Sequence, residues 1–316
     1  MRFSLIGAGG YIAPRHMKAM SDTSNVLVAA LDKHDSVGII DSYFPDAMFF
    51  QEIEQLGLFM DNLKRIGQAV DYVTVASPNF LHLPHIQFGI NAGADVICEK
   101  PLVLDPSDLD HLELLEAESG KRVYSVLQLR HHPAILKFRE NVYKNKTTKA
   151  DVELTYVTSR GKWYQQSWKG DGLKSGGLVT NVGVHFFDML HFIFGDLKEN
   201  VVFLKTPTKA SGFLEYERAR VQWYLSLDIE DVPQREREKG KRTYRSLTSN
   251  GEALEFSDGF TDLHTEVYRE IISGKGYGLQ DSRTAIETVA HIRHASVIKK
   301  NSLAHPMAKL GKATRS

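Results

Sequence analysis

The chain has 316 residues, 42% of them hydrophobic and 25% charged, which is close to the average for globular proteins. Lys+Arg and Asp+Glu each number 39, so no charge excess points to nucleic acid or to an acidic disordered tail. The single cysteine, Cys98, excludes an internal disulfide and fits a reducing compartment. No apolar run reaches the ~20 residues that span a bilayer, and no signal peptide is evident. We therefore expect a cytoplasmic protein of two domains, with neither nucleic acid nor a membrane as partner.

The N-terminus has the pattern of a dinucleotide-binding turn. A short apolar run, residues 2–6, leads into Gly7, Gly9 and Gly10, and Pro14 suits the first turn of a following helix. Glycines let the backbone approach a pyrophosphate, which then binds at the helix N-terminus. The third glycine of the G-x-G-x-x-G pattern is replaced by Ile12. Because many folds share a glycine turn, this stretch alone is weak evidence.

Asp32 gives the turn a second, independent signal. The apolar stretch 25–31 ends at Asp32, about twenty residues after the glycines, where an acid binds the adenosine ribose. An acid there also repels a 2′-phosphate, so the sequence favours NAD over NADP. The alternative is an ordinary acidic turn at a strand end.

Strand and helix patterns then alternate, which predicts a doubly wound parallel sheet of the Rossmann type. The expected elements are strands at 72–76, 96–98 and 123–127 and helices at 81–92 and 106–119. The strands end in Ser77-Pro78-Asn79, Glu99-Lys100-Pro101 and Gln128-Leu129-Arg130, three loops expected to line one rim. Lys100 is a candidate catalytic amine at this rim; the alternative is a surface lysine at a strand end.

These residues, in this order, resemble the Gfo/Idh/MocA oxidoreductases. The resemblance implies that Lys100 is catalytic, often with a cis bond before Pro101. It also implies an NAD site made of Gly7, Gly9, Gly10, Tyr11, Ile12, Asp32, Asp35, Ser36, Ser77, Asn79, His82, Glu99, Lys100, Gln128 and Trp168.

The second half of the chain predicts an α+β domain with an open-faced, mostly antiparallel sheet. After a polar loop at 144–149, residues 150–160 alternate as a half-buried strand does, and further β-rich runs follow. Two helices are expected near 262–273 and 281–300, and the charged run 235–242 is expected to be a solvated loop. We place the NAD-binding domain at 1–130 and the substrate and oligomerisation domain at 131–316.

A glycine-rich segment in this half leads into an apolar helix that carries His185 early. By itself His185 could equally be a surface histidine of that helix. The family resemblance extends here and implies that His185 acts with Lys100 in catalysis. The family's usual aspartate is Asn181, which cannot act as a base. The substrate-binding residues implied are Lys100, Arg160, Tyr164, Thr180, Asn181 and His185.

Residues 10–16, 159–164 and 167–171 look like one subgroup of the family. Its members oxidise the C3 hydroxyl of UDP-N-acetylglucosaminuronate with NAD in bacterial surface-polysaccharide (O-antigen) synthesis, and an aminotransferase uses the ketone. Some regenerate NAD with 2-oxoglutarate, and the family's open sheet implies a homodimer or tetramer. The alternatives are another sugar or inositol dehydrogenase of the family and a non-catalytic NAD- or sugar-binding regulator, which would lack the Lys/His pair.

We expect no metal. His82 and His85 could share a helix face and His131 and His132 are adjacent, but no third ligand completes either pair.

Overall fold

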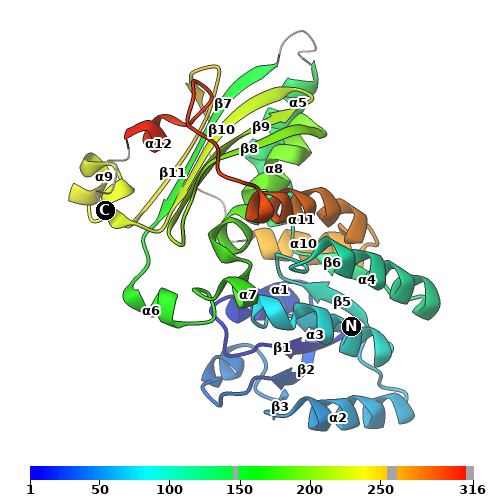
Figure 1. Cartoon of the computed structure of the whole chain (residues 1–316). Helices are drawn as coiled ribbons and strands as arrows, with labels where there is room; N and C mark the ends of the chain where they lie inside the picture. The colour runs from blue at the N-terminus through cyan, green and yellow to red at the C-terminus, as the bar shows by residue number, and fades with distance from the viewer. Residues whose placement is uncertain (145–148, 255–261, 311–316) are drawn as a thin grey trace. The chain divides into compact units, whose positions relative to one another are not determined.

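The structure is a computed structural model that describes residues 1–144, 149–254 and 262–310 (Figure 1). The chain forms two compact units. Unit 1 contains Met1–His131 and Phe260–Arg283, and unit 2 contains His132–Gly259 and Thr284–Ser316.

Unit 1 is built on a six-stranded parallel sheet in the order β3-β2-β1-β4-β5-β6. The strand order reverses between β1 and β4, and ligands of such sheets bind beyond the carboxyl ends of the strands at that point. The expected Rossmann sheet is confirmed. Its strands are β1 (Arg2–Ile6), β2 (Val26–Leu31), β3 (Met48–Phe50), β4 (Tyr72–Val75), β5 (Asp95–Cys98) and β6 (Val123–Ser125).

Helices connect these strands, as parallel pairing requires. They are α1 (Ala13–Asp22), α2 (Ile53–Arg65), α3 (His82–Asn91) and α4 (Pro106–Ser119), with short 3-10 turns at Gly38–Ser42, Asn79–Leu81 and Gln128–His131. The helix expected at 106–119 has those bounds because its ends carry local signals. Asp105 caps the first turn and Gly120, at φ +68°, ends the last.

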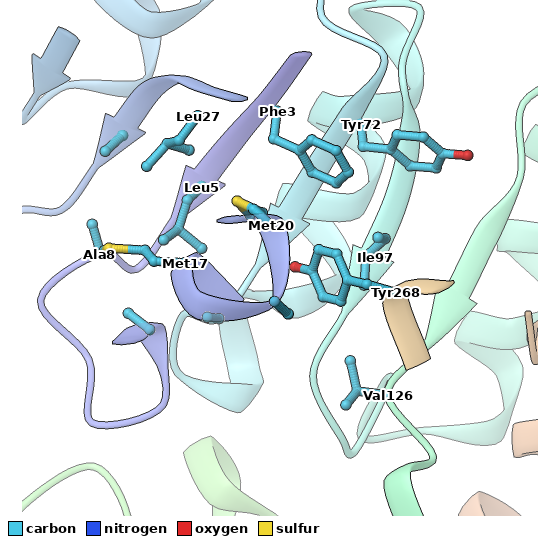
Figure 2. Packing of buried hydrophobic residues seen from close by; sticks show 14 of the residues in the cluster. Phe3, Leu5, Ala8, Met17, Met20, Leu27, Tyr72, Ile97, Val126 and Tyr268 are labelled. Atoms are coloured by element: carbon cyan, nitrogen blue, oxygen red, sulfur yellow. The ribbon is translucent and has the colours of Figure 1, made fainter. Parts of the chain in front are cut away.

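Helix α10 (Leu263–Ile272) belongs to unit 1 although it lies late in the chain. Figure 2 shows Tyr268 of this helix among Phe3, Met20 and Ile97 in the core. The Tyr268 ring stacks on Phe3 with 5.7 Å between centroids, and Phe3 also stacks on Tyr72 at 5.0 Å. The division therefore differs from the expected one at 130/131, because the apolar face of α10 completes the first core.

Unit 2 contains a six-stranded sheet in the order β12-β11-β7-β10-β9-β8 (Figure 1). Its neighbours pair antiparallel except β7 with β10, so the mostly antiparallel sheet is confirmed. The strands are β7 (Ala150–Thr158), β8 (Leu197–Lys205), β9 (Lys209–Tyr216), β10 (Ala219–Ser226), β11 (Thr243–Ser249) and β12 (Glu252–Ala253). The sequence also predicts a β-rich run at 253–256, and its last two residues lie outside the described residues.

The charged run 235–242, expected to be a solvated loop, overlaps a short helix, α9, in which no residue is buried. The helical segments of unit 2 are α5 (Pro133–Lys144), α6 (Lys162–Gln166), α7 (Gly172–Ser175), a π-helical turn (Val179–Gly183), α8 (Val184–Phe194), a 3-10 turn (Ile229–Asp231), α9 (Gln234–Glu238) and α12 (Pro306–Leu310). The boundary between the units falls within α11 (Leu279–His294).

One helical stretch, Gly172–Phe194, is long and apolar enough to cross a bilayer by composition alone. The most apolar 18-residue part of that stretch is 72% buried inside the fold. Core helices pass the same test, so the stretch is weak evidence for a membrane segment.

Candidate active site

The glycine turn after β1 lies against the ends of two neighbouring strands. Gly7 has φ +94°, and a Cβ there would lie 2.6 Å from the carbonyl carbon of Ala76. A Cβ on Gly9 would lie 3.2 Å from Oδ2 of Asp32. A side chain is therefore excluded at Gly7 and crowded at Gly9, and the bare backbone is what a phosphate group can approach.

The start of α1 fits an anionic ligand. The helix begins without a side-chain cap and without an acid in its first turn, so no side chain of the helix itself neutralises its positive end. Tyr11 is 87% exposed, whereas Ile12 packs against the core. Ile12, which replaces the third glycine of the pattern, thus anchors the turn by packing against the core.

Asp32 is held in place by backbone amides. The Gly9 N–H donates to Oδ2 at 2.9 Å, and the His34 N–H donates to Oδ1 at 3.0 Å. A carboxylate has lone pairs to spare beyond these two bonds, so it can still accept a ribose hydroxyl. Asp35 and Ser36 lie exposed in the loop that follows.

His82 joins two of the strand-end loops. Its Nδ1 lies 2.7 Å from the carbonyl oxygen of Pro101, and its Nε2 lies 2.9 Å from that of Ser77. The ring is 1% exposed; burial lowers its pKa, and the two carbonyls oppose that shift. His82 therefore links the loop after β4 to the loop after β5. Direct contact of its ring with a cofactor stays a prediction. Asn79, in the same turn, is also buried.

The Glu-Lys-Pro loop follows β5. The Lys100–Pro101 bond is cis, as the family resemblance implied, and Lys100 is half-buried. Glu99, predicted to contact the cofactor, has one carboxylate oxygen enclosed by His16 and His264 of the same unit. Neither histidine was among the predicted site residues.

Gln128 supports the fit of a cofactor. Its Oε1 is buried and has no hydrogen-bond partner within the described part of the chain. A buried acceptor without a donor is costly, and a bound group with an N–H or O–H would satisfy it. The turn, the uncapped helix, Asp32 and Gln128 together match the donor and acceptor set of a dinucleotide.

In unit 2, three predicted substrate residues lie close together. The Asn181 Nδ2 donates to the Tyr164 hydroxyl at 2.7 Å. Burial raises the pKa of Tyr164, and the Asn181 bond and the nearby Arg160 charge offset part of that shift. Arg160 is exposed just beyond β7. This cluster offers a cation beside hydrogen-bonding groups, a combination suited to an anionic sugar.

The other predicted residues of unit 2 lie on or near the same helical region. His185 is the second residue of α8, half-buried, with its ring 4.3 Å from that of Phe186. Thr180 is fully buried in the preceding π-helical turn, so its hydroxyl does not face solvent. The ammonium of Lys169 lies over the ring of Trp168 at 5.6 Å. The pairing of Lys100 in unit 1 with His185 in unit 2 stays a prediction.

Comparison with solved structures places this arrangement among dehydrogenases. The WlbA (WbpB) dehydrogenase from Thermus thermophilus, in complex with NAD and alpha-ketoglutarate, is 49% identical and has a TM-score of 0.94. The match covers 97% of this chain and 99% of that one. The same dehydrogenase in complex with NAD and UDP-GlcNAcA gives 49% identity, the same coverage and a TM-score of 0.93. The WlbA dehydrogenase from Bordetella pertussis, at 17% identity over 92% of both chains and a TM-score of 0.75, shares the fold.

Curated relatives are more distant. Inositol 2-dehydrogenase of Rhizobium meliloti is 26% identical over 62% of this chain and 56% of its own length. Glucose-6-phosphate 3-dehydrogenase of Bacillus subtilis is 24% identical over 61% of this chain and 53% of its own length. The chain thus spans about half the length of these relatives.

Family models cover both parts of the chain. Residues 1–127 match the oxidoreductase family's NAD-binding Rossmann fold, and residues 146–232 match its C-terminal alpha/beta domain. The chain therefore belongs to the Gfo/Idh/MocA oxidoreductase family.

Proposed function

We propose that the protein oxidises the C3 hydroxyl of UDP-N-acetylglucosaminuronate to a ketone with NAD. The observation that carries this proposal is the 49% identity, over nearly the whole of both chains, with a dehydrogenase solved with NAD and UDP-GlcNAcA. Identity and coverage at that level support a shared fold, cofactor and substrate class.

Lys100 and His185 would share the proton chemistry. When bound, NAD supplies the hydride acceptor. Hydride leaves carbon only as the hydroxyl proton is removed, so a base must lie within hydrogen-bond reach of that oxygen. Lys100 and His185 are the two predicted groups able to take the proton, since the amide of Asn181 cannot. Trp168 would lie near the cofactor's ribose, as the family resemblance implies.

The cluster of Arg160, Tyr164 and Asn181 would bind the uronate. A guanidinium forms two parallel hydrogen bonds with a carboxylate or phosphate, and a lysine ammonium cannot reproduce that fork. Arg160→Lys should therefore raise KM by roughly 10-fold or more while kcat changes little, consistent with the loss of about 1.5–3 kcal/mol from a charged hydrogen bond. An unchanged KM for UDP-GlcNAcA would remove Arg160 from the site.

The reaction is tested with UDP-GlcNAcA deuterated at C3. The expected result is deuterium in the reduced nicotinamide, detected by NMR or mass spectrometry, with UDP-GlcNAc as the control that lacks the carboxylate. Transfer from another carbon would refute the C3 assignment, and equal turnover of the control would refute a uronate-specific pocket.

The finer proposals concern the setting of this reaction. The ketone is a substrate for an aminotransferase in surface-polysaccharide synthesis, such as that of O-antigen, and the enzyme acts in the cytoplasm as a dimer or tetramer. The similarity to a dehydrogenase solved with NAD and alpha-ketoglutarate supports recycling of NADH by 2-oxoglutarate. Appearance of 2-hydroxyglutarate during turnover without added NAD tests the recycling, and light scattering tests the subunit number.

A second candidate is oxidation of a different sugar or of inositol. It is favoured by the curated relatives that act on inositol and on glucose 6-phosphate. A comparison of kcat/KM for these alcohols with that for UDP-GlcNAcA discriminates the two functions, and a higher value for any free alcohol would favour the second.

A further inference from the structure

Three charged or polar side chains from distant parts of the sequence meet in the core of unit 1. His16 comes from α1, Glu99 follows β5, and His264 comes from α10. Their exposed fractions are 0%, 6% and 1%. Burying an ionisable group is unfavourable unless it is paired, so this meeting needs a physical account.

One carboxylate oxygen is the centre of the cluster. The Nε2 of His264 lies 3.0 Å from Glu99 Oε1, and the Nε2 of His16 lies 3.2 Å from the same oxygen in a less well aligned contact. Burial alone would raise the pKa of Glu99, but the two imidazoles outweigh it and hold the pKa well below its usual range. Burial lowers the pKa of His264. We therefore describe the cluster as an ionised Glu99 carboxylate that accepts a hydrogen bond from a neutral His264.

The other ring nitrogen of His16, Nδ1, also has a hydrogen-bond partner. This nitrogen lies 2.9 Å from the Tyr268 hydroxyl, which in turn lies 2.9 Å from the Thr74 hydroxyl. If the tyrosine donates to Nδ1, the proton of His16 is on Nε2 and faces Glu99. The chain of contacts thus runs from β4 and α10 through α1 to the carboxylate.

The second carboxylate oxygen reaches the backbone of Lys100. The Lys100 N–H donates to Glu99 Oε2 at 3.2 Å. An ionised carboxylate accepts hydrogen bonds on both oxygens. A glutamine at this position would place its NH2 group against either the Lys100 N–H or the His264 N–H, and two donors would then face each other. The site therefore requires glutamate, with its two oxygens held in different directions.

We propose that His16, Glu99 and His264 form a positioning clamp that sets the backbone at Lys100 and thereby aims its amine. The proposal rests on the proposed proton-transfer role of Lys100. His16 and His264 act through Glu99 and touch no reacting atom, so they are positioning residues.

The same three side chains also have the composition of a metal site. Their ligand atoms lie within 4.8 Å of one another. Metal coordination would need the lone pairs of both Nε2 atoms, whereas the 3.0 Å contact from His264 to Oε1 is a satisfactory hydrogen bond without a metal. The hydrogen-bonded clamp accounts for the contacts with fewer components, and metal analysis discriminates the two.

The test compares His264→Leu, which removes the donor, with His264→Gln, which restores an N–H near the position of Nε2. His264→Leu should lower kcat for UDP-GlcNAcA by about 10²-fold, because small misplacement of a catalytic group has that effect. NAD affinity should stay within a factor of about three. His264→Gln should recover at least a tenth of the wild-type kcat. The control is His111→Leu, at an exposed histidine of the same unit that contacts Gln87, and it should leave kcat unchanged.

Several results would overturn the clamp. The first is a wild-type kcat in a folded His264→Leu variant. The second is a loss of NAD affinity in His264→Leu as large as the loss of kcat, with no recovery of kcat in His264→Gln. The third is one equivalent of a transition metal that is present in the purified wild-type protein and absent from His264→Leu. If wild-type enzyme does not oxidise UDP-GlcNAcA, the proposed function fails separately. Nitrogen-15 NMR of wild-type histidines then tests the clamp: His264 should stay neutral with its proton on Nε2 from pH 6 to 8, and titration in that range would refute it.

Discussion

Replacing Asp32 with alanine should weaken NAD binding far more than NADP binding. The variant removes the ribose acceptor and also the two bonds that Asp32 accepts from the Gly9 and His34 amides. Gly9 and His34 are exposed, so water replaces Asp32 there and the loss is small, about 0.5–1 kcal/mol. A hydrogen bond from the ribose to a carboxylate is worth about 1.5–3 kcal/mol. The sum, roughly 2–4 kcal/mol, corresponds to about 30- to 1,000-fold weaker NAD binding.

NADP should respond differently because only part of this loss applies to it. Loosening of the glycine turn affects both cofactors, whereas the ribose bond is lost by NAD alone and the repulsion of a 2′-phosphate is relieved. The NAD/NADP affinity ratio should therefore fall by roughly 10- to 150-fold or more. Fluorescence titration with both reduced cofactors measures the ratio. Asp46→Ala, which removes one exposed acid from the same unit, controls for long-range charge. A parallel loss for both cofactors would refute the ribose assignment.

Three further predictions test the proton chemistry and the two cores. Lys100→Ala and His185→Ala should each lower kcat by roughly 10²–10⁴ with NAD binding kept, and stopped-flow assays showing near-wild-type turnover in both would contradict the pair. Tyr268→Phe removes a buried hydroxyl between two polar partners and should lower the free energy of unfolding by about 2–4 kcal/mol in urea titrations; a change below 0.5 kcal/mol would mean that the partners re-pair. Burial, with a smaller effect of a nearby lysine, lowers the pKa of His305 to about 4, so the unfolded chain binds the proton first as pH falls. Stability should then be lost between about pH 6.5 and 4 by up to about 1.4 kcal/mol per pH unit, and His305→Asn should flatten that slope.

Features with local signals were predicted well from the sequence. The strand ending at Asp32, the helix at 106–119 and the glycine turn each depend on apolar spacing, a cap or a glycine within a few residues. Elements without such signals were not identified: β3 has only three residues, and α2 begins without a side-chain cap. Such segments are stabilised by their neighbours in the fold more than by their own sequence.

Contacts between distant segments lay beyond this kind of prediction. The sequence of α10 shows an apolar face, but nothing in it says which unit that face will join. The parallel pairing of β7 with β10 is another case, because alternation predicts a half-buried strand without predicting its neighbour. Both outcomes depend on the tertiary packing that buries the most apolar surface.

Glu99 shows how part of this gap can be closed by physical argument. The Glu-Lys-Pro motif at the end of an apolar strand already predicts a carboxylate at the edge of a core. If that carboxylate is buried and ionised, desolvation must be offset by donors, and neighbours in the sequence offer only the amide of Lys100. The remaining donors must come from other elements that end at the same rim. His16 lies in the first turn of α1, which follows the glycine turn, so the expected Rossmann topology brings it near that rim. His264, 165 residues away from Glu99, meets that requirement only once α10 is known to return to unit 1.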